Sequence, residues 1–339
     1  MTALYDARGN IYLVASPSTL RSLGIDIPQD AALAGATRRL WAEQAITALC
    51  DWPRGQRPEN AKEHRCDGLL IGPFQDASPF DLLIVNTDGT LAERSGNGLT
   101  IFSQALTDSG QIDTTTPFML RVHHDHGSSS SPVATMVTPD TRQALHGFWL
   151  DIGRPTFGPE AVQATRSGLV ETGHGDVKFS SVKRLIGLDP RWCRSVFVRI
   201  GNPHCVTLVS KAEALPGFRQ LHDQPLHDAL AHIAFAKGAH GDGDPCVSGV
   251  NLQWAAMSSA NTIIARVFER GEGPTASSGT SACAVAAAAW LAGSVSGGMV
   301  DVVMPGGIAP VRLIENEGSL VQILLFGTAC VLDTLTFAP

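Results

Sequence analysis

The sequence feature that most constrains the fold is an apolar segment close to the C-terminal end. Residues 282–293 read ACAVAAAAWLAG, a run that favours a helix but offers no polar face. Such a helix is usually buried on every side, because none of its faces suits contact with water. Many short strand candidates accompany it, so we predict a sheet that wraps around a central helix. The helix-like run 99–106 (LTIFSQAL) has the corresponding place in the first half of the chain.

A serine–glycine motif precedes each of these helices. The first motif is SGNG at residues 95–98, and the second is SGTS at residues 278–281. Each places a hydroxyl group at a helix start, where unpaired backbone amides attract an anion such as a carboxylate. Two such ends facing one another would hold one carboxylate between two hydroxyl groups, which suits chemistry on both faces of one carbon. Taken alone, the serines are more simply interpreted as N-caps, where serine is preferred.

The remaining pattern predicts two similar domains. Strand candidates lie at residues 10–15, 68–72, 81–86, 118–124, 133–138, 146–153, 195–201, 205–210, 251–257 and 261–269, followed by three closing strands. Helix periodicity covers 31–49 and about 220–236, and the polar, proline-rich stretch 51–65 predicts a loop. We therefore predict an α+β fold of two pseudo-symmetric domains, each a curled, mostly antiparallel sheet around a central helix. The first domain is expected to span 1–145 and the second 146–320, with 321–339 closing back onto the first.

Composition excludes several classes of protein. The chain has 339 residues, 44% hydrophobic and 17% charged, which is ample for a packed core. Its net charge of −7 gives no electrostatic case for nucleic acid or an anionic membrane. We find neither a membrane-spanning apolar run nor a signal-peptide pattern, so a cytoplasmic location is expected. The seven cysteines are scattered without a C-x-x-C spacing, which indicates buried thiols rather than disulfides or a zinc site.

No metal or organic cofactor is predicted. The HHDH string at 123–126 has a metal-like composition, but consecutive strand residues point to opposite faces. The HGDGDP string at 240–245 lacks the terminal glutamate of a calcium loop and is expected to be an inserted surface loop. No glycine-rich strand–helix motif supports a dinucleotide site.

Seven strings, in order along the chain, resemble the diaminopimelate epimerase family. They are ARGNIYLV (7–14), RCDGLLIG (65–72), VNTDGTLAERSGNGL (85–99), IGNPHCVTLV (200–209), GVNLQWA (249–255), RVFERGEGPTASSGTSACA (266–284) and MPGG (304–307). The resemblance implies the two-domain fold predicted above. It also implies inversion of an amino-acid α-carbon without pyridoxal phosphate, by two cysteines on opposite faces of the carbon.

The resemblance assigns candidate roles residue by residue. It implies substrate-binding side chains at Asn10, Asn86, Asn202, Asn251, Glu269 and Arg270. It implies a cradle for the α-carboxylate at Gly96, Asn97, Gly279 and Thr280, and a histidine beside the site at His204. Cys205 and Cys283 are next to site positions but are expected to be buried structural thiols. Thr100 stands where the family usually has arginine.

Serine at both catalytic positions is the main departure from the family. Ser95 and Ser278 stand where the family has its two cysteines. A serine hydroxyl is far less acidic than a thiol and needs a neighbouring general base, for which His204 is the candidate beside one serine. We therefore take Ser95, Ser278, His204 and Glu269 as the candidate catalytic residues.

Several functions remain open from the sequence. The preferred one is a pyridoxal-phosphate-independent amino-acid isomerase acting by proton transfer at an α-carbon. The alternatives are a non-catalytic amino-acid-binding paralogue, an epimerase inactivated by two Cys-to-Ser changes, and an enzyme of related elimination or tautomerisation chemistry. The expected partner is a small amino acid, not nucleic acid or membrane, and homodimer formation stays open.

Overall fold

The chain folds into two compact units. The structure is a computed structural model that describes residues 2–59, 61–125, 127, 130–165, 168–174, 177–238 and 240–335. Unit 1 comprises Met1–Leu150 with Phe326–Pro339, and unit 2 comprises Asp151–Leu325. The last strand therefore belongs to the same unit as the first.

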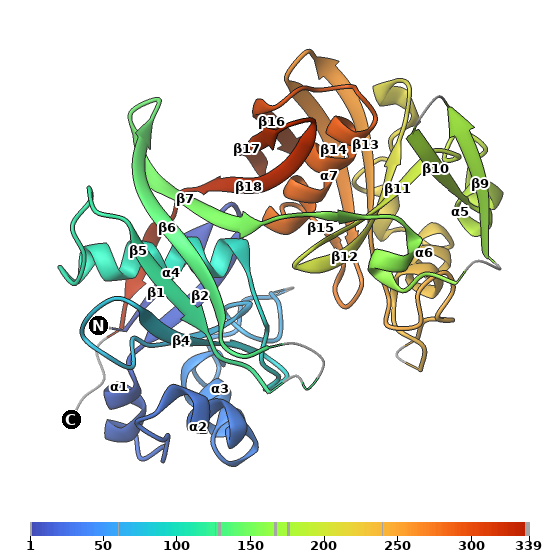
Figure 1. The fold of residues 1–339 in the computed structure, drawn as a ribbon. Coiled ribbons are helices and arrows are strands. Elements are labelled where there is room, and N and C mark those ends of the chain that lie inside the picture. Colours follow the sequence, from blue (N-terminus) through green and yellow to red (C-terminus); the bar gives the residue numbers. More distant parts are fainter. Residues whose placement is uncertain are drawn as a thin grey trace. The chain divides into compact units, whose positions relative to one another are not determined.

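Unit 1 is a mostly antiparallel sheet with helices on two faces (Figure 1). Its strands are β1 (Ala3–Ala7), β2 (Asn10–Ala15), β3 (Gly68–Ile71), β4 (Phe80–Asn86), β5 (Phe118–Val122), β6 (Val133–Arg142), most of β7 (Leu145–Gly153) and β19 (Cys330–Thr334). Its helices are α1 (Pro17–Ser22), α2 (Ala31–Ala36), the 3₁₀ turn η1 (Arg38–Leu40), α3 (Ala42–Leu49) and α4 (Gly96–Asp108). The strands pair in the order β19–β1–β2–β3–β4–β5–β6–β7, with β2–β3 and β4–β5 parallel and the others antiparallel.

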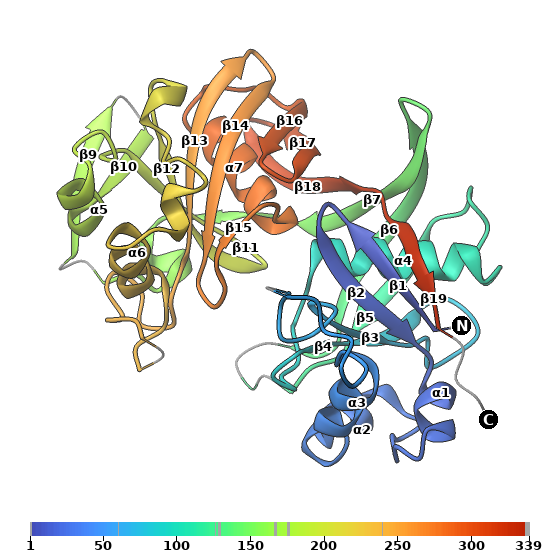
Figure 2. The same ribbon diagram turned by 180° about the vertical axis from the view of Figure 1, so that it is seen from behind.

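Alternation along the strands of unit 1 builds two apolar layers. Leu69 and Ile71 of β3 belong to a buried cluster with Trp41, Ile46 and other residues of α2 and α3. Leu70 points the other way and reaches the first turn of α4, which packs against β1 and β2. Successive strand residues face opposite sides of a sheet, so one strand serves both layers. Figure 2 shows α1, α2 and α3 gathered at one side of this unit.

Unit 2 repeats the plan around a second helix. Its strands are β8 (Thr156–Phe157), β9 (Leu169–His174), β10 (Val177–Val182), β11 (Ser195–Ile200), β12 (Asn202–Leu208), β13 (Asn251–Ser259), β14 (Thr262–Glu269), β15 (Gly273–Thr275), β16 (Gly298–Met304), β17 (Gly307–Asn316) and most of β18 (Ser319–Gly327). Its helices are η2 (Pro159–Val162), α5 (Lys183–Leu188), η4 (Ala212–Ala214), η5 (Gln220–His222), α6 (Leu226–Ala234) and α7 (Gly279–Leu291). Only β12–β13 and β14–β16 are parallel among the pairings of these described strands.

The apolar helix α7 is the core of unit 2. Every residue from Gly279 to Ala289 is buried, and the helix contacts β11, β12, β13, β14, β16 and β17. The other face of the sheet carries a second cluster, in which Trp254 and Phe268 are fully buried beside residues of α5 and α6. A helix with no polar face is thus buried by a sheet that curls around it, as the sequence predicts.

The strands of the two units pair in the same order and with the same directions. In unit 1, a parallel β2–β3 pair, an antiparallel β3–β4 pair and a loop lead into α4. In unit 2, a parallel β12–β13 pair, an antiparallel β13–β14 pair and a loop lead into α7. The strand after each helix then pairs parallel to the second strand of the antiparallel pair, β5 with β4 and β16 with β14, and unit 2 adds the short strand β15 between β14 and α7. The predicted pseudo-symmetric fold is therefore confirmed.

The prediction of helical structure throughout residues 31–49 is wrong, because the helix is interrupted. The segment forms α2, a 3₁₀ turn and α3 instead of one helix. The indole N–H of Trp41 donates to the carbonyl oxygen of Ala34 at 3.0 Å, and the ring is 1% exposed. Burying this ring folds the chain back on itself, so a tertiary contact overrides the local periodicity.

Several elements are absent from the sequence prediction. The sequence does not predict the strands β1, β8, β9, β10 and β15 or the short helices α1 and α5, and α6 covers only part of the helical stretch expected at 220–236. Among the described residues, none of the helices has the length and apolar composition needed to cross a membrane.

Candidate active site

Ser95 is the N-cap of α4. Its backbone is extended, with φ −136° and ψ 120°, and its hydroxyl oxygen accepts the N–H of Gly98 at 3.0 Å. Gly96 and Asn97 form the first turn and are buried. The N-terminal amides of a helix favour a negatively charged group. This helix start therefore has the local structure of an anion-binding site, with a hydroxyl group beside it.

Ser278 is the N-cap of α7 in the same geometry. Its φ is −149° and its ψ 121°, and its hydroxyl oxygen accepts the N–H of Ser281 at 3.4 Å. Gly279 and Thr280 form the buried first turn. The structure thus combines the two interpretations of the serines, since both are N-caps and both sit at a helix start suited to a carboxylate.

Glu269 lies against Ser278. The Glu269 carboxylate, at the end of β14, is hydrogen-bonded to the Ser278 side chain. Burial raises the pKa of Glu269 to about 7, and the charge of Glu272 adds to the rise. The hydrogen bond from Ser278 and the charge of Arg270 oppose it. A carboxyl group with a pKa near 7 can both accept and donate a proton at neutral pH.

His204 lies in a buried hydrogen-bond network beneath the start of α7. Its Nδ1 is 3.0 Å from Nε2 of Gln253, which also donates to Oγ of Ser281 at 3.0 Å. His204, Gln253 and Ser281 are all fully buried. Burial, together with the charge of Arg270, lowers the pKa of His204 to about 3. The ring is therefore neutral near pH 7. Gln253, which contacts both His204 and Ser281, connects the ring to the first turn of α7.

Arg270 joins the two candidate asparagines of unit 2. Its backbone N–H donates to Oδ1 of Asn251 at 2.9 Å, and its Nη2 donates to Oδ1 of Asn202 at 3.4 Å. Its Nη1 donates to the carbonyl oxygen of Ser248 at 3.3 Å. Asn202 and Asn251 begin the parallel strands β12 and β13, and β14 ends beside them. The predicted polar residues of unit 2 therefore gather at one end of its sheet.

The candidate asparagines of unit 1 occupy the matching end of its sheet. Asn10 begins β2, and Asn86 ends β4 opposite Gly68. The side-chain amide of Asn10 donates to Oδ2 of Asp67 at 3.0 Å, and that of Asn86 donates to Oγ1 of Thr90 at 2.9 Å. Asn86 lies nine residues before Ser95, and Glu269 lies nine residues before Ser278. Asn86 and Glu269 therefore occupy equivalent positions in the two units.

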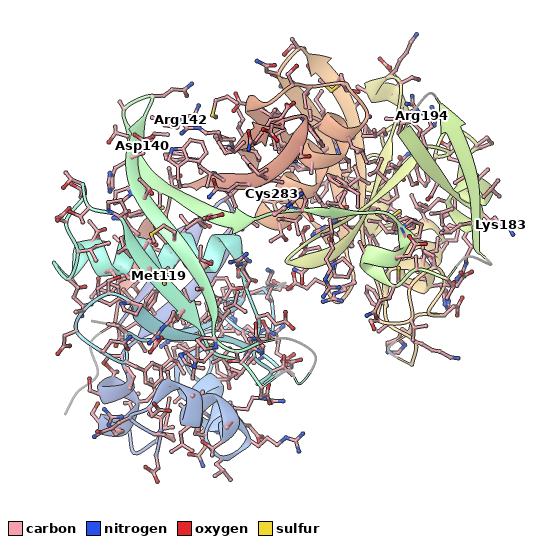
Figure 3. All side chains as sticks on the ribbon, in the orientation of Figure 1. Met119, Asp140, Arg142, Lys183, Arg194 and Cys283 are labelled. Atoms are coloured by element: carbon pink, nitrogen blue, oxygen red, sulfur yellow. The ribbon has the colours of Figure 1, made fainter. Side chains whose placement is uncertain are left out.

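The remaining sequence candidates are structural. Cys205 and Cys283 are buried, and Figure 3 shows Cys283 on α7 among the strands of unit 2. Thr100 lies within α4, where its hydroxyl donates to the carbonyl oxygen of Gly96 at 2.9 Å. Within the described ranges, His, Cys, Asp and Glu side chains form no group able to hold a metal ion. His126 of the HHDH string lies outside the described residues.

Sequence reasoning missed the supporting residues Gln253, Ser281 and Asp67. Gln253 lies between the buried residues Leu252 and Trp254 of β13, and a glutamine at a buried strand position signals a hydrogen-bond network. Ser281 lies three residues after Ser278, at the position that a capping serine contacts. Asp67 gives no such signal, because its contact with Asn10 depends on the pairing of β2 with β3.

Sequence comparison places this geometry in a family. The family model described as diaminopimelate epimerase matches residues 196–329. The diaminopimelate epimerase of Cupriavidus pinatubonensis is 30% identical over 258 residues, which cover 73% of this chain and 78% of the relative. The chain belongs to the diaminopimelate epimerase family. The enzyme of the same name from Burkholderia vietnamiensis is 32% identical over 224 residues, 66% of each chain. This member of the family is an isomerase of the racemase and epimerase type.

Solved structures share the fold at low sequence identity. A phenazine biosynthesis protein of the PhzF family from Bacillus anthracis aligns with a TM-score of 0.57 and 11% identity, covering 98% of this chain and 96% of that one. A hydroxyproline epimerase from Agrobacterium vitis, solved with bound trans-4-hydroxy-L-proline, aligns with a TM-score of 0.56 and 15% identity, covering 98% and 90%. These likenesses support the two-unit, sheet-around-helix architecture.

Proposed function

We propose that this protein isomerises an amino acid by moving a proton at the α-carbon, without pyridoxal phosphate. The observation that carries the proposal is the contact between Ser278 and Glu269 at the N-terminus of α7. It places a proton acceptor, a hydroxyl group and unpaired helix amides together. Proton abstraction next to a carboxylate needs these three functions.

Glu269 is the proton carrier in this proposal. A serine hydroxyl alone is too weakly acidic to give a useful alkoxide at neutral pH. The Ser278 oxygen accepts the backbone N–H of Ser281 at 3.4 Å, and hydrogen bonding by Ser278 favours the charged form of the Glu269 carboxylate. Glu269 can thus take the α-proton directly or through Ser278. Inversion then needs a proton delivered to the other face of the α-carbon, for example from a water molecule, and a pKa near 7 lets Glu269 release the first proton to the resulting hydroxide.

The substrate carboxylate is assigned to the helix N-termini. The amides of Gly279 and Thr280 in α7, and of Gly96 and Asn97 in α4, lie in buried first turns. Helix amides stabilise the negative charge that develops on the carboxylate when the α-proton leaves. We propose that the start of α7 binds the α-carboxylate of the substrate, and that the start of α4, with Ser95, is the equivalent anion-binding position of unit 1.

A second polar group on the substrate is assigned to the asparagines and Arg270. A guanidinium group can bind a carboxylate with two parallel hydrogen bonds, which a lysine does not match. The guanidinium group of Arg270 donates to Oδ1 of Asn202, and Asn251 holds the backbone N–H of Arg270. This arrangement supports a substrate with an amino-acid-like distal end, such as diaminopimelate.

His204 positions the start of α7 in this proposal. Its pKa of about 3 leaves it neutral at physiological pH, and it contacts Gln253, which in turn contacts Ser281. A group that stays neutral is a poor proton carrier near pH 7. His204 therefore holds the first turn of the helix in place, and Glu269 carries the proton.

The test is exchange of the α-proton in deuterium oxide. The protein is incubated with diaminopimelate and with a panel of other amino acids, and loss of the α-proton signal is followed by NMR. We expect exchange with at least one amino acid, and a decrease of about 10²- to 10⁴-fold in the Glu269→Gln variant. Ser277→Ala is the matched control, and it should keep the rate. Binding without exchange would refute the proposal in favour of a binding protein.

A second experiment distinguishes a changed substrate from changed catalytic groups. The double variant Ser95→Cys with Ser278→Cys is assayed for inversion of diaminopimelate. Thiols titrate far lower than hydroxyl groups, and a helix N-terminus lowers their pKa further. Inversion by this variant would show that the pocket still fits diaminopimelate. If the variant binds diaminopimelate but leaves it unchanged, the assignment of these positions to the α-carbon is wrong.

A further inference from the structure

Unit 1 contains a cavity that lies apart from the residues assigned to catalysis. Its volume is about 590 Å³, and it lies beside the C-terminal half of α4, between α1 and the loop that follows β3. Ser95 lies at the opposite end of α4 and does not line it. Cavities of roughly 300–1,000 Å³ are the usual size for sites that bind small molecules. The cavity is therefore large enough for a ligand of its own.

One wall of the cavity is apolar. Val14 of β2 and Ala105 of α4 line it and are buried, and Phe74 of the loop after β3 lines it and is half-buried. The N–H of Gly72 donates to the carbonyl oxygen of Ala15 at 3.0 Å, which joins the ends of the parallel strands β3 and β2. The sheet thus fixes the backbone on this side of the cavity. A short apolar group would be removed from water by packing against this wall.

Two opposite charges lie at the solvent-exposed side of the cavity. Arg21 of α1 and Asp76 of the loop after β3 both line it and are exposed. Within the part of the chain that the structure describes, neither side chain takes part in an ion pair. Nη1 of Arg21 donates to the carbonyl oxygen of Ile27 at 3.3 Å, and its Nε and Nη2 have no partner among the described residues. A ligand that carries both charges would give each of them a partner.

We propose that this cavity binds a free α-amino acid with an apolar side chain. The carboxylate of the ligand accepts hydrogen bonds from the Arg21 guanidinium, and its ammonium group donates to the Asp76 carboxylate. The side chain of the ligand packs against Val14, Phe74 and Ala105. A carboxylate or an amine alone would satisfy only one of the two charges, so a zwitterion fits this cavity better than either.

The test is an NMR titration of the full-length protein with L-leucine. The methyl groups of alanine and valine are isotopically labelled, and the signals of Val14 and Ala105 report on the cavity. We expect saturable shifts of both signals with a dissociation constant of about 1 mM, because two exposed charge contacts and one small apolar side chain give only modest affinity. Ala45 and Val85, in the apolar cluster around α3, are the internal control and should not shift.

Two analogues of leucine test the charge assignment. Isocaproate lacks the ammonium group, and isoamylamine lacks the carboxylate. Each should bind about 3- to 10-fold more weakly than leucine, because each leaves one charge of the cavity without a partner. An analogue that binds as tightly as leucine would overturn the assignment of a zwitterion. The lack of saturable shifts at Val14 and Ala105 would overturn the site itself.

Single substitutions assign the two contacts. Arg21→Gln and Asp76→Asn should each weaken leucine binding about 3- to 10-fold, and Arg21→Gln should leave the binding of isoamylamine unchanged. Arg39→Gln and Glu43→Gln, at exposed positions outside the cavity, are the matched controls and should bind leucine like the wild type. Arg270→Gln, in unit 2, should not change the shifts in the cavity, because this binding does not depend on the proposed catalytic reaction. If Arg21→Gln and Asp76→Asn bind leucine as tightly as the wild type, the proposal is wrong.

Discussion

Replacing Glu269 with glutamine should change how the stability of the protein depends on pH. Glu269 is partly buried, lies near Glu272 and is hydrogen-bonded to Ser278, and its pKa in the folded protein is about 7. Glutamine has nearly the same shape and can still accept the Ser278 hydrogen bond, but it does not ionise. The variant therefore removes the buried charge and leaves the packing in place.

The pKa of Glu269 sets the size and the pH range of the effect. An ordinary glutamate ionises near pH 4.5, so the unfolded chain loses this proton well before the folded protein does. Between pH 4.5 and about 7 the folded state holds more protons, and the free energy of unfolding therefore falls as pH rises. The whole difference corresponds to about 3 kcal/mol, since each tenfold change in an equilibrium constant is about 1.4 kcal/mol.

Urea unfolding of the wild type and the variant across pH 4.5 to 8 measures this effect. We expect the variant to gain about 3 kcal/mol relative to the wild type between pH 4.5 and 7.5, with no further gain above pH 7.5. Glu43→Gln, at an exposed position on α3, is the matched control and should follow the wild-type curve. A constant difference between the Glu269→Gln variant and the wild type at all pH values would refute the raised pKa and, with it, the proton carrier that we assign.

Three further predictions concern caps, the buried histidine and close backbone contacts. Ser95→Ala should lower the free energy of unfolding by about 1 kcal/mol, because α4 loses its N-cap, and an unchanged urea midpoint would contradict this. Burial lowers the pKa of His204 to about 3, so its NMR ring signals should not titrate between pH 5 and 8. Below pH 6.5 the unfolded chain takes up a proton on this histidine before the folded protein does, which lowers the free energy of unfolding; His204→Gln should reduce that decrease. Gly147→Ala should lower the melting temperature markedly, because a Cβ atom there would overlap the carbonyl oxygen of Gly327, whereas Gly187→Ala in α5 has open space and should raise stability by about 0.5–1 kcal/mol. Equal melting temperatures for the two glycine variants would show that the backbones at Gly147 are not in close contact.

Local sequence patterns predicted the helices and strands that have a clear apolar pattern or a clear capping or turn residue at their ends. The apolar run 282–293 and the serine before it predicted the buried helix α7 and its N-cap. Apolar runs predicted β4 and β13, whose residues are buried on both faces of the sheet over most of their length, and alternation of buried and partly exposed residues marks β14. The helix expected at 31–49 failed because the burial of Trp41 is a tertiary contact, which periodicity along the chain does not express.

The sequence by itself determined the fold and the candidate residues at two helix starts. A helix with no polar face has to be buried on every side, and the many strand candidates in the sequence indicate a sheet as its cover. A serine before each helix is typical of an N-cap, which also places a hydroxyl group beside unpaired amides. Only the tertiary structure decided what those residues can do. The groups around His204, Gln253 of β13 and Arg270 at the end of β14, are distant from it in the sequence, and the pKa of His204 depends on burial and on the charge of Arg270. The sequence fixes which ionisable side chains are present, whereas their surroundings in the folded protein fix the pKa at which each gains or loses its proton.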